Sequence, residues 1–193
     1  MKPSVKLKVT TERPFSAHHM LIGAAQASLE DAKAKRPGWF YSELVTITLS
    51  ALSIEAMCNA VGDRVIVDWK DFESSSPNAK LRLLCEHLKI QYDKSKEPWV
   101  SARWLYKLRN LIAHAKPELV REQAVFSREE YDRRSPEFPK SKLEKEITLT
   151  NAARAWRTAE DIKDILTSKV PPENALGLYA DASFGRASLD DGN

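Results

Sequence analysis

One predicted helix, residues 41–61, is apolar on nearly every side, and this feature constrains the fold of the chain more than any other. Two apolar faces form along it at about 100° per residue. The first contains Leu44, Ile47, Thr48, Ala51, Ile54, Glu55 and Cys58, and the second contains Val45, Leu49, Leu52 and Ala56. Such a helix lies either at the centre of its domain or between a core and a partner subunit. The sequence therefore predicts a helical domain built around this segment, with a homodimer covering the second face.

The rest of the chain also has the pattern of helices. Only 6 glycines occur in 193 residues, and alternation of apolar and polar residues is confined to a short extended segment near residues 5–9. Capping, turn and proline signals predict helices at residues 11–35, 41–61, 77–91, 98–117 and 142–169. Thr11 marks the start of the first helix, Ser76 with Pro77 marks the start of the third, and Gly62 ends the second. We expect an all-α, up-and-down bundle of about five helices.

The length of the chain suits one domain with a core. We expect a single helical domain at residues 1–170, followed by a small polar tail at 171–193 that is poorly ordered. The polar stretch at residues 118–141 carries the pattern of a capping box at Ser127 and Glu130. Connections between bundle helices are usually short, so this one is expected to be partly helical or to cover another part of the molecule.

Composition indicates a soluble globular protein, because 42% of the residues are hydrophobic and 30% are charged. Polar residues interrupt the longest apolar stretch, so no membrane span is predicted. The N-terminus has no compact apolar region and no cleavage-type site, so no secretion signal is predicted and we expect a cytoplasmic location. Cys58 and Cys85 lack the CxxC spacing of metal sites and are expected to be buried thiols. No metal site and no cofactor are predicted. A net charge of +3 permits nucleic-acid binding without favouring it.

An arginine followed five positions later by a histidine occurs three times, although chance alone predicts about a quarter of one such match. The pairs are Arg13 with His18, Arg82 with His87, and Arg109 with His114. The first pair spans a helix start, and the second flanks the apolar face of an ordinary helix. In the third, asparagine follows the arginine, the residues between are apolar, and the histidine falls in the last turn before Pro117. Context therefore singles out the third pair.

The stretch RNLIAH, residues 109–114, resembles the Rx4-6H motif of the HEPN superfamily, whose arginine is typically followed by a polar residue. The upstream helix LSIEAMCNAVG, with Glu55 and Asn59, is also similar to the long helix that precedes this motif in such proteins. The resemblance rests on residues 44–115. It implies an α-helical, usually dimeric domain. Many members are metal-independent endoribonucleases of toxin–antitoxin, abortive-infection and RNA-processing systems, and others only bind RNA, nucleotides or proteins.

Carried over to this sequence, the resemblance makes Arg109 and His114 the catalytic pair and Asn110 an accessory residue. Histidine suits the two proton transfers of RNA cleavage, and the planar arginine fork suits phosphate oxygens. Arg103 and Lys107 are candidate RNA-binding residues on the same helix. Trp99, Trp104 and Tyr106 are interleaved with these cations along the helix and fit either base stacking or core packing, with packing favoured for Trp104. The expected function is a metal-independent endoribonuclease, a toxin or defence effector whose partners are RNA, a second copy of the chain and an antitoxin protein.

Helix geometry raises a difficulty, because positions five apart differ by about 140° in direction. Arg109 and His114 therefore cannot stand side by side on one continuous helix. A two-fold dimer would bring both pairs to one cleft, and unwinding before His114 is a second solution. Glu55 is expected to be an accessory residue that orients an arginine or histidine of the site, because a carboxylate on an apolar face is costly unless it is paired. A plainer interpretation also stands: Glu55 and Arg109 form a structural ion pair, and His114 is only favoured by the dipole at the helix end. The alternative function is then a non-catalytic helical module that binds a protein, RNA or nucleotide.

Overall fold

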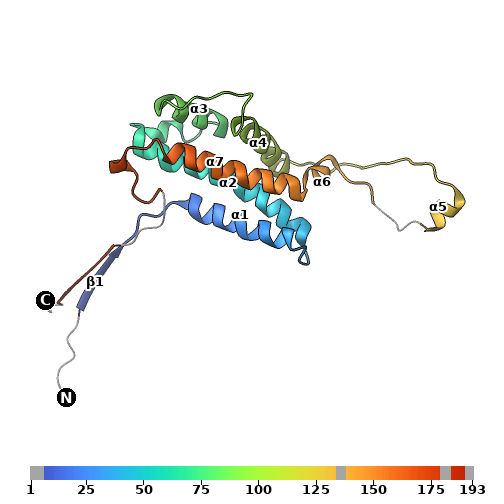
Figure 1. Cartoon of the computed structure of the whole chain (residues 1–193), viewed down its shortest axis with the longest axis horizontal. Helices are drawn as coiled ribbons and strands as arrows, with labels where there is room; N and C mark the ends of the chain where they lie inside the picture. The colour runs from blue at the N-terminus through green and yellow to red at the C-terminus, as the bar shows by residue number, and fades with distance from the viewer. Residues whose placement is uncertain (1–6, 134–137, 179–183, 190–193) are drawn as a thin grey trace, which may run out of the picture.

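The computed structural model describes residues 7–133, 138–178 and 184–189, and it is mostly helical (Figure 1). Its α-helices are α1 (Ala17–Lys33), α2 (Trp39–Val65), α3 (Pro77–His87), α4 (Trp99–Ala113), α5 (Arg128–Arg133), α6 (Lys142–Glu146) and α7 (Leu149–Thr167). Two 3₁₀ turns, η1 (Trp69–Phe72) and η2 (Pro172–Asn174), and two strands, β1 (Leu7–Glu12) and β2 (Phe184–Leu189), complete the described chain. The helical class predicted from the sequence is confirmed, and a small antiparallel sheet is added to it.

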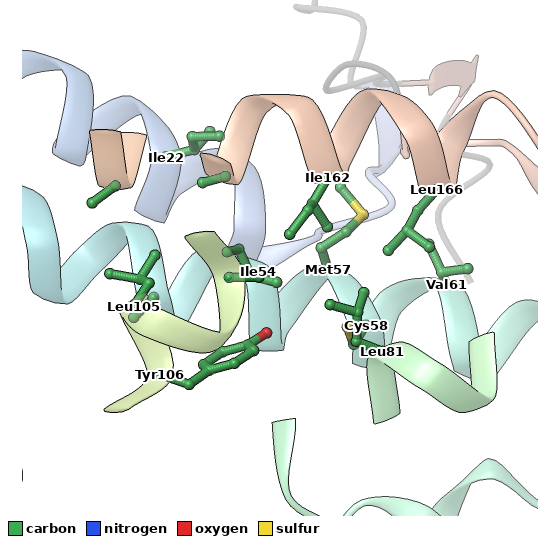
Figure 2. Packing of buried hydrophobic residues seen from close by; sticks show 14 of the residues in the cluster. Ile22, Ile54, Met57, Cys58, Val61, Leu81, Leu105, Tyr106, Ile162 and Leu166 are labelled. Carbon is green, nitrogen blue, oxygen red and sulfur yellow. The ribbon is translucent and has the colours of Figure 1, made fainter. Parts of the chain in front are cut away.

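Helix α2 lies at the centre of the molecule and contacts α1, α3, α4 and α7. In Figure 1 it runs beside α1 and α7, with α3 and α4 on its other side. Figure 2 shows the core that these helices share, which includes Ile22, Ile54, Met57, Cys58, Val61, Leu81, Leu105, Ile162 and Leu166. The second apolar face of α2 is less covered: Val45 is 40% exposed, and Leu49, Leu52 and Ala56 are only partly buried.

Helix α2 is also long and apolar enough to cross a membrane, by length and composition alone. Half of its most apolar stretch is buried against the rest of the described chain. The core helix of a soluble domain has the same length and composition, so α2 is no strong signal of a membrane protein.

Gly62 lies inside α2, and the prediction that it ends this helix is wrong. Trp69 of η1 packs directly on it: a Cβ atom added at Gly62 would lie 2.3 Å from two carbons of the indole ring. The glycine therefore serves the close approach of an aromatic ring rather than a turn. Helix α2 continues to Val65.

Other helix boundaries also differ from the predicted ones: α3 ends at His87 rather than near residue 91, and α4 ends at Ala113 rather than near residue 117. Helix α1 starts after Ser16, because Thr11 belongs to β1. The single helix predicted at residues 142–169 is divided into α6 and α7, and Thr148 caps α7 by accepting a hydrogen bond from the Asn151 amide at 3.2 Å. The predicted starts at Ser76 and at Ser127 are confirmed.

The chain after Pro171 differs from the polar tail expected there. Ala175 and Leu178 are buried. Strand β2 pairs with β1, Val9 standing opposite Ala187, so the short extended segment predicted near the N-terminus is confirmed as a strand. Figure 1 shows this sheet extending from the end of the helical body where α1 begins. The last residues of the predicted tail, 190–193, lie outside the described part.

The polar connection between α4 and α6 leaves the helical body at the opposite end and carries α5 (Figure 1). It is partly helical, as expected. Its apolar side chains Leu119, Val125 and Phe138 are exposed. The connection starts directly after the RNLIAH stretch, so the candidate site lies at its base.

Candidate functional site

An ion pair between Glu55 of α2 and Arg109 of α4 is the centre of the candidate site. Nη2 of Arg109 donates to Oε2 of Glu55 at 2.6 Å. The two side chains remain 25% and 24% exposed, respectively. The prediction that Glu55 lies within reach of an arginine, Arg109 in particular, is confirmed, although the pair is half-buried rather than enclosed.

Lys80 of α3 is a second cation on the same carboxylate. Its Nζ donates to Oε1 of Glu55 at 3.3 Å, and its side chain is only 2% exposed. Sequence reasoning missed Lys80, since a lysine in the first turn of an amphipathic helix is usually solvated. The available signal was its position four residues before Leu84, on the row of side chains that α3 buries.

Asn110 contributes to the geometry of Arg109. Its Oδ1 accepts a hydrogen bond from Nη1 of Arg109 at 3.1 Å, so Glu55 and Asn110 hold the two terminal nitrogens of the guanidinium. The third nitrogen, Nε, is buried and has no hydrogen-bond partner in the described chain. Arg109 thus has a fixed orientation before any ligand arrives.

His114 stands apart from this cluster. Helix α4 ends at Ala113, and His114 is its C-cap, with its amide donating to the carbonyl of Asn110 at 3.0 Å. Its side chain is exposed and forms no hydrogen bond or ion pair with the residues that the structure describes. One copy of the chain therefore does not join Arg109 and His114, as the 140° difference in direction indicates.

Helix α4 presents a basic face to solvent. Arg103, Lys107, Asn110 and His114 follow each other at spacings of three or four residues and therefore share one side of the helix. Helix α4 contains no Asp or Glu. Two cations, Arg103 and Lys107, therefore stand on this face with no acidic residue on the same helix.

The aromatic residues of α4 are not free to stack on bases. Trp99 and Tyr106 are buried. Trp104 is partly buried, and the guanidinium of Arg154 from α7 lies 4.4 Å from its ring centroid. The packing interpretation is the correct one for these three side chains.

The other two Arg-x4-His pairs form no comparable cluster. His18 is buried on α1 and donates from Nε2 to the carbonyl of Leu178 at 3.3 Å. His87 is exposed on the last turn of α3.

Both cysteines are buried as expected, and burial raises the pKa of each thiol, to about 12 for Cys85. Within the described ranges, no three His, Cys, Asp or Glu side chains gather as a metal site would require.

Buried His18 makes the stability of the fold depend on pH. Burial lowers the pKa of His18 from its ordinary value of 6.5 to about 4, with a smaller contribution from neighbouring His19. The unfolded chain therefore binds more protons than the folded one between these two values. The contribution of His18 to stability is complete above pH 6.5 and is lost as the pH falls toward 4, by about 3 kcal/mol. Urea unfolding of the wild type and of His18→Leu at pH 7 and pH 4.5 tests this prediction: the leucine variant should lose distinctly less stability on acidification, and equal losses would contradict it.

Comparison with protein-family models, with characterised proteins and with solved structures finds no match for this chain. The interpretation of the site therefore rests on its residues and their geometry.

Proposed function

We propose that this protein is a metal-independent endoribonuclease of the HEPN type that acts as a homodimer. The observation that carries the proposal is the fixed guanidinium of Arg109, held by Glu55 and Asn110 near the end of α4. Exposed His114 follows on the same helix end, and the acid-free basic face of α4 runs up to it. These are the groups that RNA cleavage without a metal requires, and they coincide with the RNLIAH motif.

The reaction needs a base, an acid and a cation. One histidine removes the proton of the RNA 2′-hydroxyl, and the 2′-oxygen attacks the adjacent phosphorus. Arginine binds the non-bridging oxygens as negative charge develops on them. A second histidine gives a proton to the departing 5′-oxygen, so the products are a 2′,3′-cyclic phosphate and a 5′-hydroxyl. Two histidines are used, and each chain has one in this motif.

A second copy of the chain supplies the missing histidine in this proposal. The less covered apolar face of α2, formed by Val45, Leu49, Leu52 and Ala56, is the surface for that contact. Burial of such a face on association is favourable. Two-fold symmetry then places both copies of Arg109 and His114 in one groove. The cellular role in this proposal is that of a cytoplasmic toxin or defence effector controlled by an antitoxin protein.

Cleavage of RNA in the presence of EDTA tests the proposal. We expect the purified protein to cut single-stranded RNA without added metal and to leave a 2′,3′-cyclic phosphate, identified by mass spectrometry of the fragments. A strict requirement for Mg²⁺, or fragments that end in a 3′-hydroxyl, would contradict this mechanism.

A non-catalytic RNA-binding module is the second candidate. The observation that favours it is the engagement of Arg109 by Glu55, which leaves the arginine a structural role at the α2–α4 contact. This function predicts RNA binding through Arg103 and Lys107 with no fragments formed. The EDTA experiment separates the two candidates when binding is measured on the same sample.

A further inference from the structure

Glu55 is shared by two cations, and the charges of the three residues do not cancel. Lys80 binds one carboxylate oxygen and Arg109 binds the other. Within the part of the chain that the structure describes, both cations find their only ion pair on this carboxylate. Two positive charges and one negative charge leave a net charge of +1.

The two cations differ in access to solvent. Lys80 is 2% exposed and lies too deep to meet a large ligand, whereas Arg109 is 24% exposed. Glu55 is therefore neutralised from the buried side by Lys80. The net charge of +1 belongs to the three residues together, and Arg109 is the cation among them that reaches solvent.

Burial of Lys80 has no evident benefit for stability. Removing a charge from water is costly even when it is paired, and apolar residues of similar volume often stabilise a protein equally or better. Two further polar atoms near the cluster, Nε of Arg109 and the hydroxyl of Tyr106, lack hydrogen-bond partners in the described chain. Burial raises the pKa of Tyr106 well above its usual range, and the charges of Glu55 and Arg109 also act on its hydroxyl. Figure 2 shows its hydroxyl directed into the core beside α2. This concentration of buried polar groups is typical of a functional site.

We infer that Lys80 is a positioning residue of a phosphate site. It offsets the negative charge of Glu55, so that Glu55 does not cancel the attraction of Arg109 for a phosphate group of RNA. Without Lys80, Glu55 and Arg109 would form a neutral pair. Glu55 would still orient the guanidinium but would oppose the approach of a phosphate. The inference rests on the proposed RNA-cleaving function for the identity of the ligand.

Charge substitutions in a His114→Ala background test the inference, because binding is then measured without cleavage. Affinity for a fluorescein-labelled single-stranded RNA is read by fluorescence anisotropy. Lys80→Met replaces the buried ammonium with an apolar chain of similar length. We expect affinity to fall about tenfold, since the charged hydrogen bond between Arg109 and the RNA phosphate is weakened. The double variant Lys80→Met/Glu55→Gln restores the net charge of +1 without restoring either ion pair. We expect its affinity to return to within about twofold of the background protein.

The double variant separates charge from structure. If Lys80 only supported the fold, losing both ion pairs would harm binding at least as much as losing one, and that outcome would overturn the inference. Lys94→Met removes the same charge from an exposed loop and is the matched control. A loss of affinity in Lys94→Met equal to that in Lys80→Met would also overturn the inference, because net charge alone would then explain the result.

The unsubstituted protein provides a test that does not depend on the folding of a variant. Titration with inorganic phosphate, followed through the ¹⁵N resonance of the Arg109 side chain, should shift that resonance at millimolar concentrations. No shift would overturn the inference. If the shift and the charge pattern both appear while RNA stays intact in EDTA, the phosphate site stands and only the proposed cleavage fails.

Discussion

Replacing His114 or Arg109 with alanine is expected to lower the rate of RNA cleavage by about 10²- to 10⁴-fold, the usual contribution of a general acid or base. His114→Ala removes the proton transfers, and Arg109→Ala removes the cation that the phosphate meets. His114 is exposed at the end of α4 and Arg109 is only half-buried, so neither change should unfold the protein. Initial cleavage rates in EDTA, compared with unfolding curves of each variant, provide the measurement.

His87→Ala is the matched control for this prediction. His87 has the same spacing to an arginine, Arg82, and it is also exposed in the last turn of a helix. Arg82 is not followed by asparagine and does not pair with Glu55. We expect its rate to remain within about twofold of the wild type, since surface substitutions away from a site are usually neutral. A loss equal to that of His114→Ala would show that the wrong pair was chosen.

Mixed dimers show whether the site crosses the interface. An Arg109→Ala subunit and a His114→Ala subunit, each inactive alone, should regain partial activity when combined, because the heterodimer contains one intact residue of each kind. No recovery despite subunit exchange, or full activity from a protein that light scattering shows to be monomeric, would contradict the composite site.

Substitution of Gly62 with alanine is expected to destabilise the fold by about 3 kcal/mol or more. The added Cβ would meet the indole ring of Trp69 at 2.3 Å, and the ring is itself buried. Relief of this overlap requires displacement of η1 from α2. Chemical unfolding followed by circular dichroism measures the loss.

Gly23→Ala is the matched control, because this glycine also lies in a helix but faces open space, with no atom within 4 Å of its added Cβ. Alanine is the better helix former by about 0.5–1 kcal/mol. The two substitutions are therefore expected to change stability in opposite directions. A neutral Gly62→Ala variant would contradict the packing of Trp69.

The sequence by itself determined the features that depend on neighbouring residues. Helical periodicity placed α2 at the centre of the molecule, and serine caps placed the starts of α3 and α5. The pairing of Glu55 with Arg109 is the exception: the two residues are 54 positions apart, yet the pair was predictable because a carboxylate on an apolar face requires a cation and few cations lie on apolar stripes.

Tertiary structure alone decided the rest. Gly62 has the local signature of a helix stop, yet a ring seven residues later makes it a packing site. Lys80 has the signature of a solvated lysine, yet a carboxylate 25 residues earlier holds it in the core. Strands β1 and β2 come from opposite ends of the chain, so no local pattern could pair them. In each case the deciding partner is distant in sequence, and its position is set by how the helices pack around α2 rather than by the residue and its neighbours.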